Sequence, residues 1–124
     1  MFSLPSSLRL LRRSPGRLSP AQAHRHLRDE QAVLLDVREM SEWLSGHAPC
    51  ALHLPLSRLR AGSPLPAAAH GKPILVICRS GHRSQQAAEL LTARGVEARD
   101  ITGGMIAWAR EGLPVADESS GSIA

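Results

Sequence analysis

Aromatic side chains and cysteines are scarce in this chain. Its 124 residues include no tyrosine, one phenylalanine, two tryptophans and two cysteines. Two cysteines are too few for the disulfide framework of a small secreted domain, which favours a reducing compartment and a fold held by an apolar core. No apolar run approaches the roughly 18 residues that a membrane-spanning helix needs. We therefore expect a soluble protein with one folded domain.

Acidic residues are absent from the first 28 positions, which contain six arginines. The remaining 96 residues carry nine basic and eleven acidic side chains, so the net charge of +4 divides into +6 and −2. A mildly acidic body with few aromatic side chains disfavours nucleic acid as a partner. Residues 1–16 are expected to form a disordered basic arm, although their composition also resembles a mitochondrial transit peptide. We expect a cytoplasmic location, with a mitochondrial one as the alternative if the arm is a targeting signal.

Short apolar segments alternate with amphipathic segments along residues 17–115. Strands are predicted over 33–37, 51–54, 74–77 and 97–101, and helices from residue 20 onward, over 40–44, 55–59 and 85–94, and around 105–108. Ser19 and Gln22 form the pattern of a capping box at the first helix. Strands that alternate with helices predict a parallel sheet with helices on both faces. The tail, residues 116–124, is small and polar, and we expect it to be disordered.

The most reactive side chain in this pattern is Cys78, which follows the apolar strand 74–77 and precedes a helix. A thiol between backbone N–H groups and the positive end of a helix dipole is stabilised as the nucleophilic thiolate. Gly81 allows the positive φ that a nest of inward N–H groups requires. The candidate binding loop around the cysteine consists of Arg79, Ser80, Gly81, His82, Arg83 and Ser84.

Charged side chains in and near this loop suggest further roles. Arg79 can bind an incoming oxyanion through charge and forked hydrogen bonds, and Arg83 either fixes the loop or contacts substrate. His82, at the loop tip, is interpreted as a modulator of substrate access. Asp36, Arg38 and Glu39 end a strand at the same edge of the sheet; they either shape the pocket or form an ion-pair network that fixes the turn.

Four separated motifs occur in the order found in single-domain rhodaneses. They are LDVRE at 35–39 with Trp43 and Gly46-His47 after it, LHLPL at 52–56, CRSGHRS at 78–84 and GGMIAW at 103–108. The chain therefore resembles the rhodanese family of thiosulfate sulfurtransferases over about residues 17–115. The resemblance implies a five-stranded parallel sheet between helices, with a short first strand near Arg17 and Leu18.

The resemblance also implies an activity. Cys78 would take sulfane sulfur from thiosulfate or a persulfide and pass it to a thiol or cyanide acceptor, or to a protein acceptor. No cofactor is implied. No metal site is expected, since His24 and His26 are two positions apart and diverge on a helix.

Two other functions remain open from the sequence. Cysteine phosphatases and arsenate reductases on a related fold place an arginine six positions after the cysteine, whereas Arg83 lies five positions after Cys78. The shorter loop suits a persulfide and leaves less room for a tetrahedral phosphate. A non-catalytic interaction module or persulfide carrier is the third reading. Cys50 stands where the family usually has glycine; it is read either as a resolving thiol or, preferably, as a small buried residue.

Overall fold

The computed structural model describes residues 16–116, so the basic arm except Gly16 and the expected tail except Ala116 lie outside the described residues. Five parallel strands form one sheet in the order β1-β5-β4-β2-β3. The strands are β1 (Arg17–Leu18), β2 (Val33–Asp36), β3 (Leu52–His53), β4 (Ile74–Ile77) and β5 (Ala98–Ile101). The helices are α2 (Pro20–Arg28), α3 (Met40–Ser45), α4 (Leu56–Arg60), α5 (Arg83–Ala93) and α6 (Gly104–Arg110), with the 3₁₀ turn η1 (Ala67–Ala69).

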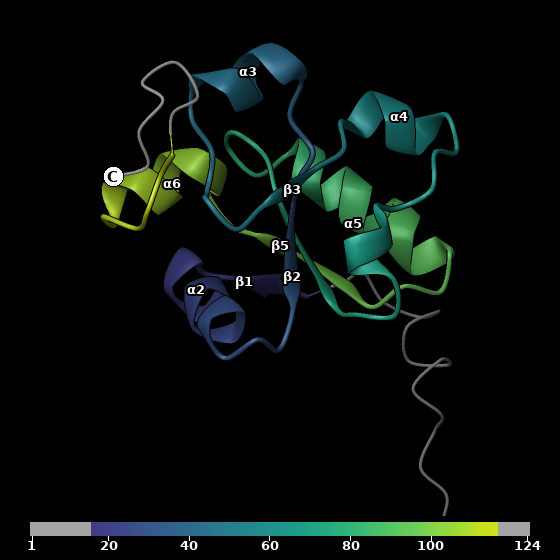
Figure 1. Cartoon of the computed structure of the whole chain (residues 1–124), viewed down its shortest axis with the longest axis horizontal. Helices are drawn as coiled ribbons and strands as arrows, with labels where there is room; N and C mark the ends of the chain where they lie inside the picture. The colour runs from purple at the N-terminus through teal and green to yellow at the C-terminus, as the bar shows by residue number, and fades with distance from the viewer. Residues whose placement is uncertain (1–15, 117–124) are drawn as a thin grey trace, which may run out of the picture.

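Helices cover both faces of the sheet, as Figure 1 shows. On one face, strand residues pack with Leu59 of α4 and with Ala87 and Leu91 of α5. On the other face, the apolar cluster includes Ala23 of α2 and Trp108 of α6. The expected α/β architecture, including the short first strand, is confirmed.

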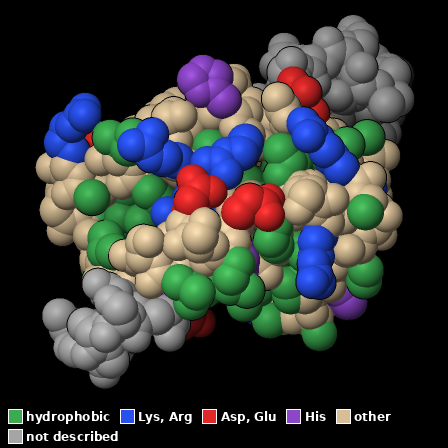
Figure 2. Space-filling view, turned by 90° about the horizontal axis from the view of Figure 1, so that it is seen from above, with side chains coloured by type: hydrophobic (Ala, Val, Ile, Leu, Met, Phe, Trp, Pro, Cys, Tyr) green, Lys and Arg blue, Asp and Glu red, His purple; other side chains and the backbone are tan. Residues whose placement is uncertain are grey.

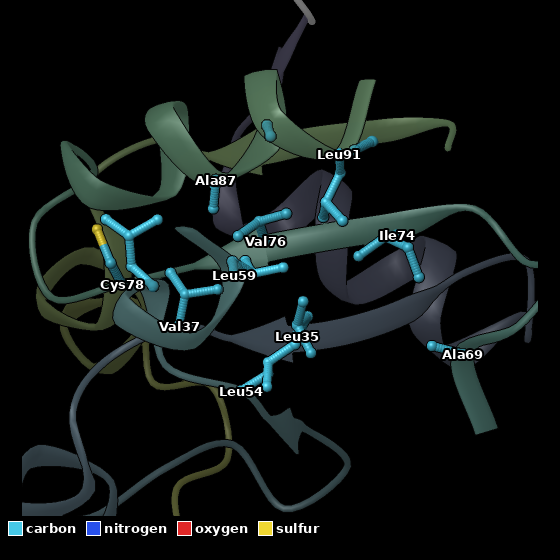
Figure 3. Close-up of a cluster of buried hydrophobic side chains, with 13 residues drawn as sticks. Leu35, Val37, Leu54, Leu59, Ala69, Ile74, Val76, Cys78, Ala87 and Leu91 are labelled. Carbon is cyan, nitrogen blue, oxygen red and sulfur yellow. The ribbon is translucent and has the colours of Figure 1, made fainter. Parts of the chain in front are cut away.

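Alternation along β4 determines which way the cysteine points. Successive strand side chains point to opposite faces. Ile74 and Val76 pack on the side of α4 and α5, whereas Leu75 and Ile77 pack on the side of α2 and α6. Cys78 continues the first series, and Figure 3 shows it at the end of the row that begins with Ile74 and Val76. The strand therefore delivers the thiol toward the N-terminus of α5.

Several local predictions can be compared with the structure. The capping box is present, since Ser19 Oγ accepts from the Gln22 N–H and Gln22 Oε1 accepts from the Ser19 N–H. Helix α5 begins at Arg83, two residues earlier than predicted, and the 3₁₀ turn η1 lies in a stretch for which no element was predicted. The preferred view of Cys50 as a buried residue is wrong, because it lies exposed on the surface. Partial desolvation raises the pKa of its thiol.

The two tryptophans differ in burial. Trp108 is buried, and its Nε1–H donates to the carbonyl of Pro114 at 2.8 Å. Trp43 is only half-buried and stacks on His47 and His53, with ring centroids 3.5 and 4.6 Å away. Trp43 therefore fixes the segments beside the carboxyl edge of the sheet and is not a core residue.

Candidate active site

The loop after β4 closes around a buried sulfur atom. The Cys78 residue is 1% exposed, and its Sγ accepts a hydrogen bond from the Gly81 N–H at 3.0 Å. Ser84, in the first turn of α5, places its Oγ 3.4 Å from Sγ. Gly81 has the predicted positive φ, +106°. A Cβ at this position would lie 3.0 Å from Arg17 Nη2 and 3.1 Å from the Gly103 nitrogen, so a larger residue would displace these neighbours slightly in addition to straining the backbone.

Helix α6 supports the loop from below through its first backbone groups. The Met105 N–H donates to the carbonyl of Cys78 at 2.8 Å, and the Ile106 N–H donates to that of Arg79 at 3.1 Å. These contacts use two N–H groups that have no partner within the helix. They also turn the carbonyls of Cys78 and Arg79 toward α6, and the Gly81 N–H of the same loop donates to the sulfur.

Arg83 forms an ion pair with Glu42 of α3, so it joins the loop to the neighbouring helix. Both Nη atoms donate to the carboxylate, at 2.7 and 2.8 Å. This hydrogen bonding lowers the pKa of Glu42 to about 2 from 4.5 and raises the pKa of Arg83. A bidentate pair holds a guanidinium in one orientation, and the arginine is engaged with an acid in this structure.

Glu42→Gln is expected to remove a pH-dependent part of the stability. A carboxyl with a lowered pKa in the folded state stabilises the fold above its ordinary pKa, and that stabilisation is lost as the pH falls from about 4.5 toward 2. Both side chains of the pair are partly exposed, so solvent screening limits the loss to at most about 1 kcal/mol. Urea unfolding at about pH 4.5 and at about pH 2 measures how much unfolding free energy each protein loses over this interval. Glu42→Gln should lose less than the parent protein, and equal losses in the two proteins would contradict the expectation.

Asp36 and Arg38 form a buried ion pair at the end of β2. Arg38 Nε and Nη2 donate to the two carboxylate oxygens at 3.0 and 2.8 Å, and Nη2 also donates to the Gly46 carbonyl at 2.7 Å. Glu39 is exposed, and its carboxylate accepts from Ser57 Oγ at 3.3 Å. The contacts of Asp36 and Arg38 join the β2 turn to the end of α3, and Glu39 takes no part in them.

A second buried network, which the sequence analysis missed, lies behind the loop. Asp100 of β5 is 2% exposed and accepts from Arg17 Nε at 2.9 Å and Nη2 at 3.0 Å. It also accepts from Ser84 Oγ at 3.0 Å, and Arg17 Nη2 donates to the Gly81 carbonyl at 3.1 Å. The available signal was the alternation along β5, which turns Asp100 to the same side as Ala98 and hence toward α5.

The face around the loop is rich in basic side chains. Figure 2 looks onto this face and shows Lys and Arg side chains spread across it, with two acidic side chains near its middle. Arg79 and His82 are exposed, and His82 Nδ1 lies 3.4 Å from Ser80 Oγ. A groove of about 370 Å³ runs beside the loop between α3 and α6; it is lined by Arg38, Glu42, Ser45, Gly46, Arg79, Met105, Ile106, Ala109 and Val115. Within residues 16–116, Arg79 has no ion-pair partner, so its charge faces this open groove.

Neither a metal site nor a membrane span is found within residues 16–116. No three His, Cys, Asp or Glu side chains there are placed to hold a metal ion. None of the described helices is long and apolar enough to cross a membrane. The loop itself offers the Cys78 sulfur, the Gly81 N–H that donates to it and the exposed side chains of Arg79 and His82.

Fold and site together define a parallel α/β domain in which a strand-to-helix loop presents a buried cysteine. The rhodanese-like domain model matches residues 19–111, and the chain belongs to this family. It is 33% identical over 104 residues to the adenylyltransferase and sulfurtransferase UBA4 of Yarrowia lipolytica, covering 78% of this chain and 26% of that protein. It is 38% identical over 88 residues to a sulfurtransferase of Allochromatium vinosum, covering 69% of this chain and 79% of that protein.

A third relative, an uncharacterized protein of Synechocystis, is 41% identical over 99 residues, covering 78% of this chain and 54% of that protein. The chain therefore spans only 26% and 54% of two of these relatives. Among solved structures, a rhodanese-related protein of Thermoplasma volcanium has a TM-score of 0.69 at 30% identity, and the match covers 81% of this chain and 96% of that one. A possible tyrosine phosphatase of Rhodopseudomonas palustris has a TM-score of 0.70 at 21% identity, and the match covers 93% of this chain and 98% of that one. At this identity the likeness shows a shared fold alone.

Proposed function

We propose that this protein is a sulfurtransferase that carries sulfane sulfur on Cys78, from thiosulfate or a persulfide to a thiol or cyanide. The observation that carries the proposal is the Gly81 N–H, 3.0 Å from Sγ in a loop with Arg83 five positions after the cysteine. An amide at this distance stabilises negative charge on sulfur. The relatives named as sulfurtransferases support the same class of reaction.

The proposed reaction has two sulfur transfers. The Cys78 thiolate attacks the sulfane sulfur of thiosulfate; a new S–S bond forms, the old one breaks, and sulfite leaves with the bonding electron pair. The enzyme then holds a Cys78 persulfide. An acceptor thiolate or cyanide attacks its terminal sulfur, and the Cys78 thiolate leaves with the electron pair. The loop amides stabilise the anionic sulfur in both states.

The test of this proposal is a comparison of two activities on the unaltered protein. Transfer of sulfur from thiosulfate to cyanide should be measurable, and hydrolysis of an aryl phosphate should not. Phosphatase activity without sulfur transfer would favour the phosphatase alternative. Formation of a persulfide that neither cyanide nor small thiols remove would favour a carrier that serves a protein partner.

Arg79→Ala is expected to weaken the use of thiosulfate more than the use of an uncharged organic persulfide. Arg79 is exposed beside the cysteine, and only thiosulfate presents a sulfonate to its guanidinium. Loss of one charge-assisted hydrogen bond costs about 1.5–3 kcal/mol, which should appear in kcat/KM for thiosulfate. Arg58→Ala, also exposed, is the control for loss of surface charge. Equal losses with both donors would mean that Arg79 does not select the donor.

One inserted glycine between Gly81 and His82 is expected to lower sulfur transfer at least about tenfold, or about 1.4 kcal/mol of transition-state stabilisation. The insertion gives the loop the six-position spacing of phosphatases and moves the Gly81 amide away from Sγ. Aryl phosphate hydrolysis, measured on both proteins, should arise only in the insertion variant, if at all. Full sulfur transfer after the insertion would show that loop length does not select the reaction.

A further inference from the structure

The buried carboxylate of Asp100 reaches Cys78 through one intervening side chain. Asp100 Oδ2 accepts from Ser84 Oγ at 3.0 Å, and Ser84 Oγ lies 3.4 Å from Cys78 Sγ. All three side chains are buried. Arg17 Nε donates to Asp100 Oδ1 at 2.9 Å, and Arg17 Nη2 donates at 3.0 Å to Oδ2, the oxygen that also accepts from Ser84. This chain of contacts joins the sulfur to β5 and β1 through buried side chains and the partly exposed Arg17.

The direction of these hydrogen bonds follows from the number of protons available. An ionised carboxylate paired with arginine can only accept, so the single hydroxyl proton of Ser84 must be donated to Asp100. Ser84 then offers only lone pairs to the sulfur. A Cys78 thiol satisfies this geometry by donating its S–H to Ser84 Oγ. A thiolate or persulfide has no proton on Sγ, so its electron pairs face those of Ser84 unless the hydroxyl turns.

We propose that Asp100 is a positioning residue that acts on Cys78 through Ser84. Its carboxylate holds the Ser84 hydroxyl away from the sulfur and thereby favours the protonated thiol in the resting protein. When Cys78 loses its proton to a base in solvent, the hydroxyl turns and donates to the sulfur. Asp100 remains paired with Arg17, so it is not left without a partner. Arg17 thus limits how strongly Asp100 holds the hydroxyl.

Other charged groups surround the loop, but they reach the sulfur differently. Arg83 on α5 is paired with Glu42 of α3, and His82 and Arg79 are exposed at the loop. Arg17 of β1 contacts the Gly81 carbonyl. Within residues 16–116, Asp100 is the acid whose hydrogen-bond partner, Ser84, also forms a hydrogen bond with Cys78 Sγ. The inference deepens the proposed function, but its main readout, alkylation of Cys78, requires no sulfur donor.

The test is the pH dependence of Cys78 alkylation by iodoacetamide, with the modified cysteine identified by peptide mass so that Cys50 is counted separately. Asp100→Asn should shift the rate profile to lower pH, giving about tenfold faster alkylation below the midpoint, because the carboxylate no longer holds the hydroxyl. Arg17→Met should shift the profile to higher pH, because Asp100 then depends more on Ser84. Arg17→Lys should restore part of the original profile. A merely structural network would loosen the loop and move both variants in the same direction.

A double-mutant cycle distinguishes an effect of Asp100 that passes through Ser84 from a direct effect of the Asp100 or Arg17 charge on Cys78. In a Ser84→Ala background the shifts caused by Asp100→Asn and Arg17→Met should fall to less than half. Arg94→Met, which removes an arginine that binds backbone carbonyls near α4, should leave the profile unchanged. Shifts of equal size with and without Ser84, or no shift in either variant, would overturn the proposal. If Asp100→Asn does not fold, the proposal is decided by the shift that Arg17→Met causes with Ser84 present, compared with its shift in the Ser84→Ala background. Persulfide formation from thiosulfate, followed in the same proteins, tests the proposed function separately.

Discussion

Cys78→Ser is expected to lose all measurable transfer of sulfur from thiosulfate to cyanide while it keeps the fold. A serine oxygen is not ionised at neutral pH, attacks sulfur poorly and cannot hold a persulfide. The substitution is nearly isosteric, and the Gly81 N–H and Ser84 Oγ that contact Sγ can also bond a hydroxyl. Thermal unfolding should therefore show a midpoint close to that of the parent.

Cys50→Ser is the matched control, since Cys50 is the other cysteine of the chain and lies exposed. It should retain full transfer activity. Activity that survives in Cys78→Ser would show that sulfur moves without Cys78. Loss of activity in Cys50→Ser would instead support the resolving-thiol interpretation of that residue.

Gly104→Ala is expected to destabilise the fold by at least about 3 kcal/mol and to impair transfer strongly. A Cβ at Gly104 would lie 2.4 Å from the carbonyl oxygen of Cys78 and 2.5 Å from that of Arg79, and the residue has a φ of +57°. These neighbours are backbone atoms, so relief requires the active loop and α6 to separate. Separation would break the bonds from the Met105 and Ile106 N–H groups to the loop.

The control for Gly104→Ala is Gly112→Ala. Gly112 also has a positive φ, +76°, but a Cβ there would meet no atom within 4 Å. This variant should lose only about 1 kcal/mol, the cost of the backbone conformation. The difference between the two variants in chemical unfolding measures the steric part. Equal losses would show that close approach of α6 to the loop does not determine the need for glycine.

Most of the fold could be predicted because its signals are local. The apolar run 74–77 and the alternation of strands with helices indicate a parallel sheet, and the loop after β4 places Cys78 at its carboxyl edge. The capping box at the start of α2 is formed by Ser19 and Gln22, which are only three positions apart in the sequence. The short β1 has no such signal; its position came from the family resemblance alone.

The rest of the site depends on contacts between distant residues, which local patterns do not encode. Arg17 and Asp100 are 83 positions apart, and Glu42 and Arg83 are 41 apart. Either acid could have paired with another arginine of the chain. The burial of Cys50 was also predicted wrongly, since a small side chain near a strand can lie at its solvent-facing end.

Intact-mass measurement of the protein after brief treatment with thiosulfate shows directly whether Cys78 carries sulfane sulfur. We expect a gain of one sulfur atom in the parent protein, located on Cys78 by peptide mass, and its removal by cyanide as thiocyanate. Cys78→Ser should gain no mass under the same conditions. An unchanged mass of the parent protein, or sulfur found on Cys50 and not on Cys78, would contradict the role of Cys78 as the sulfur carrier.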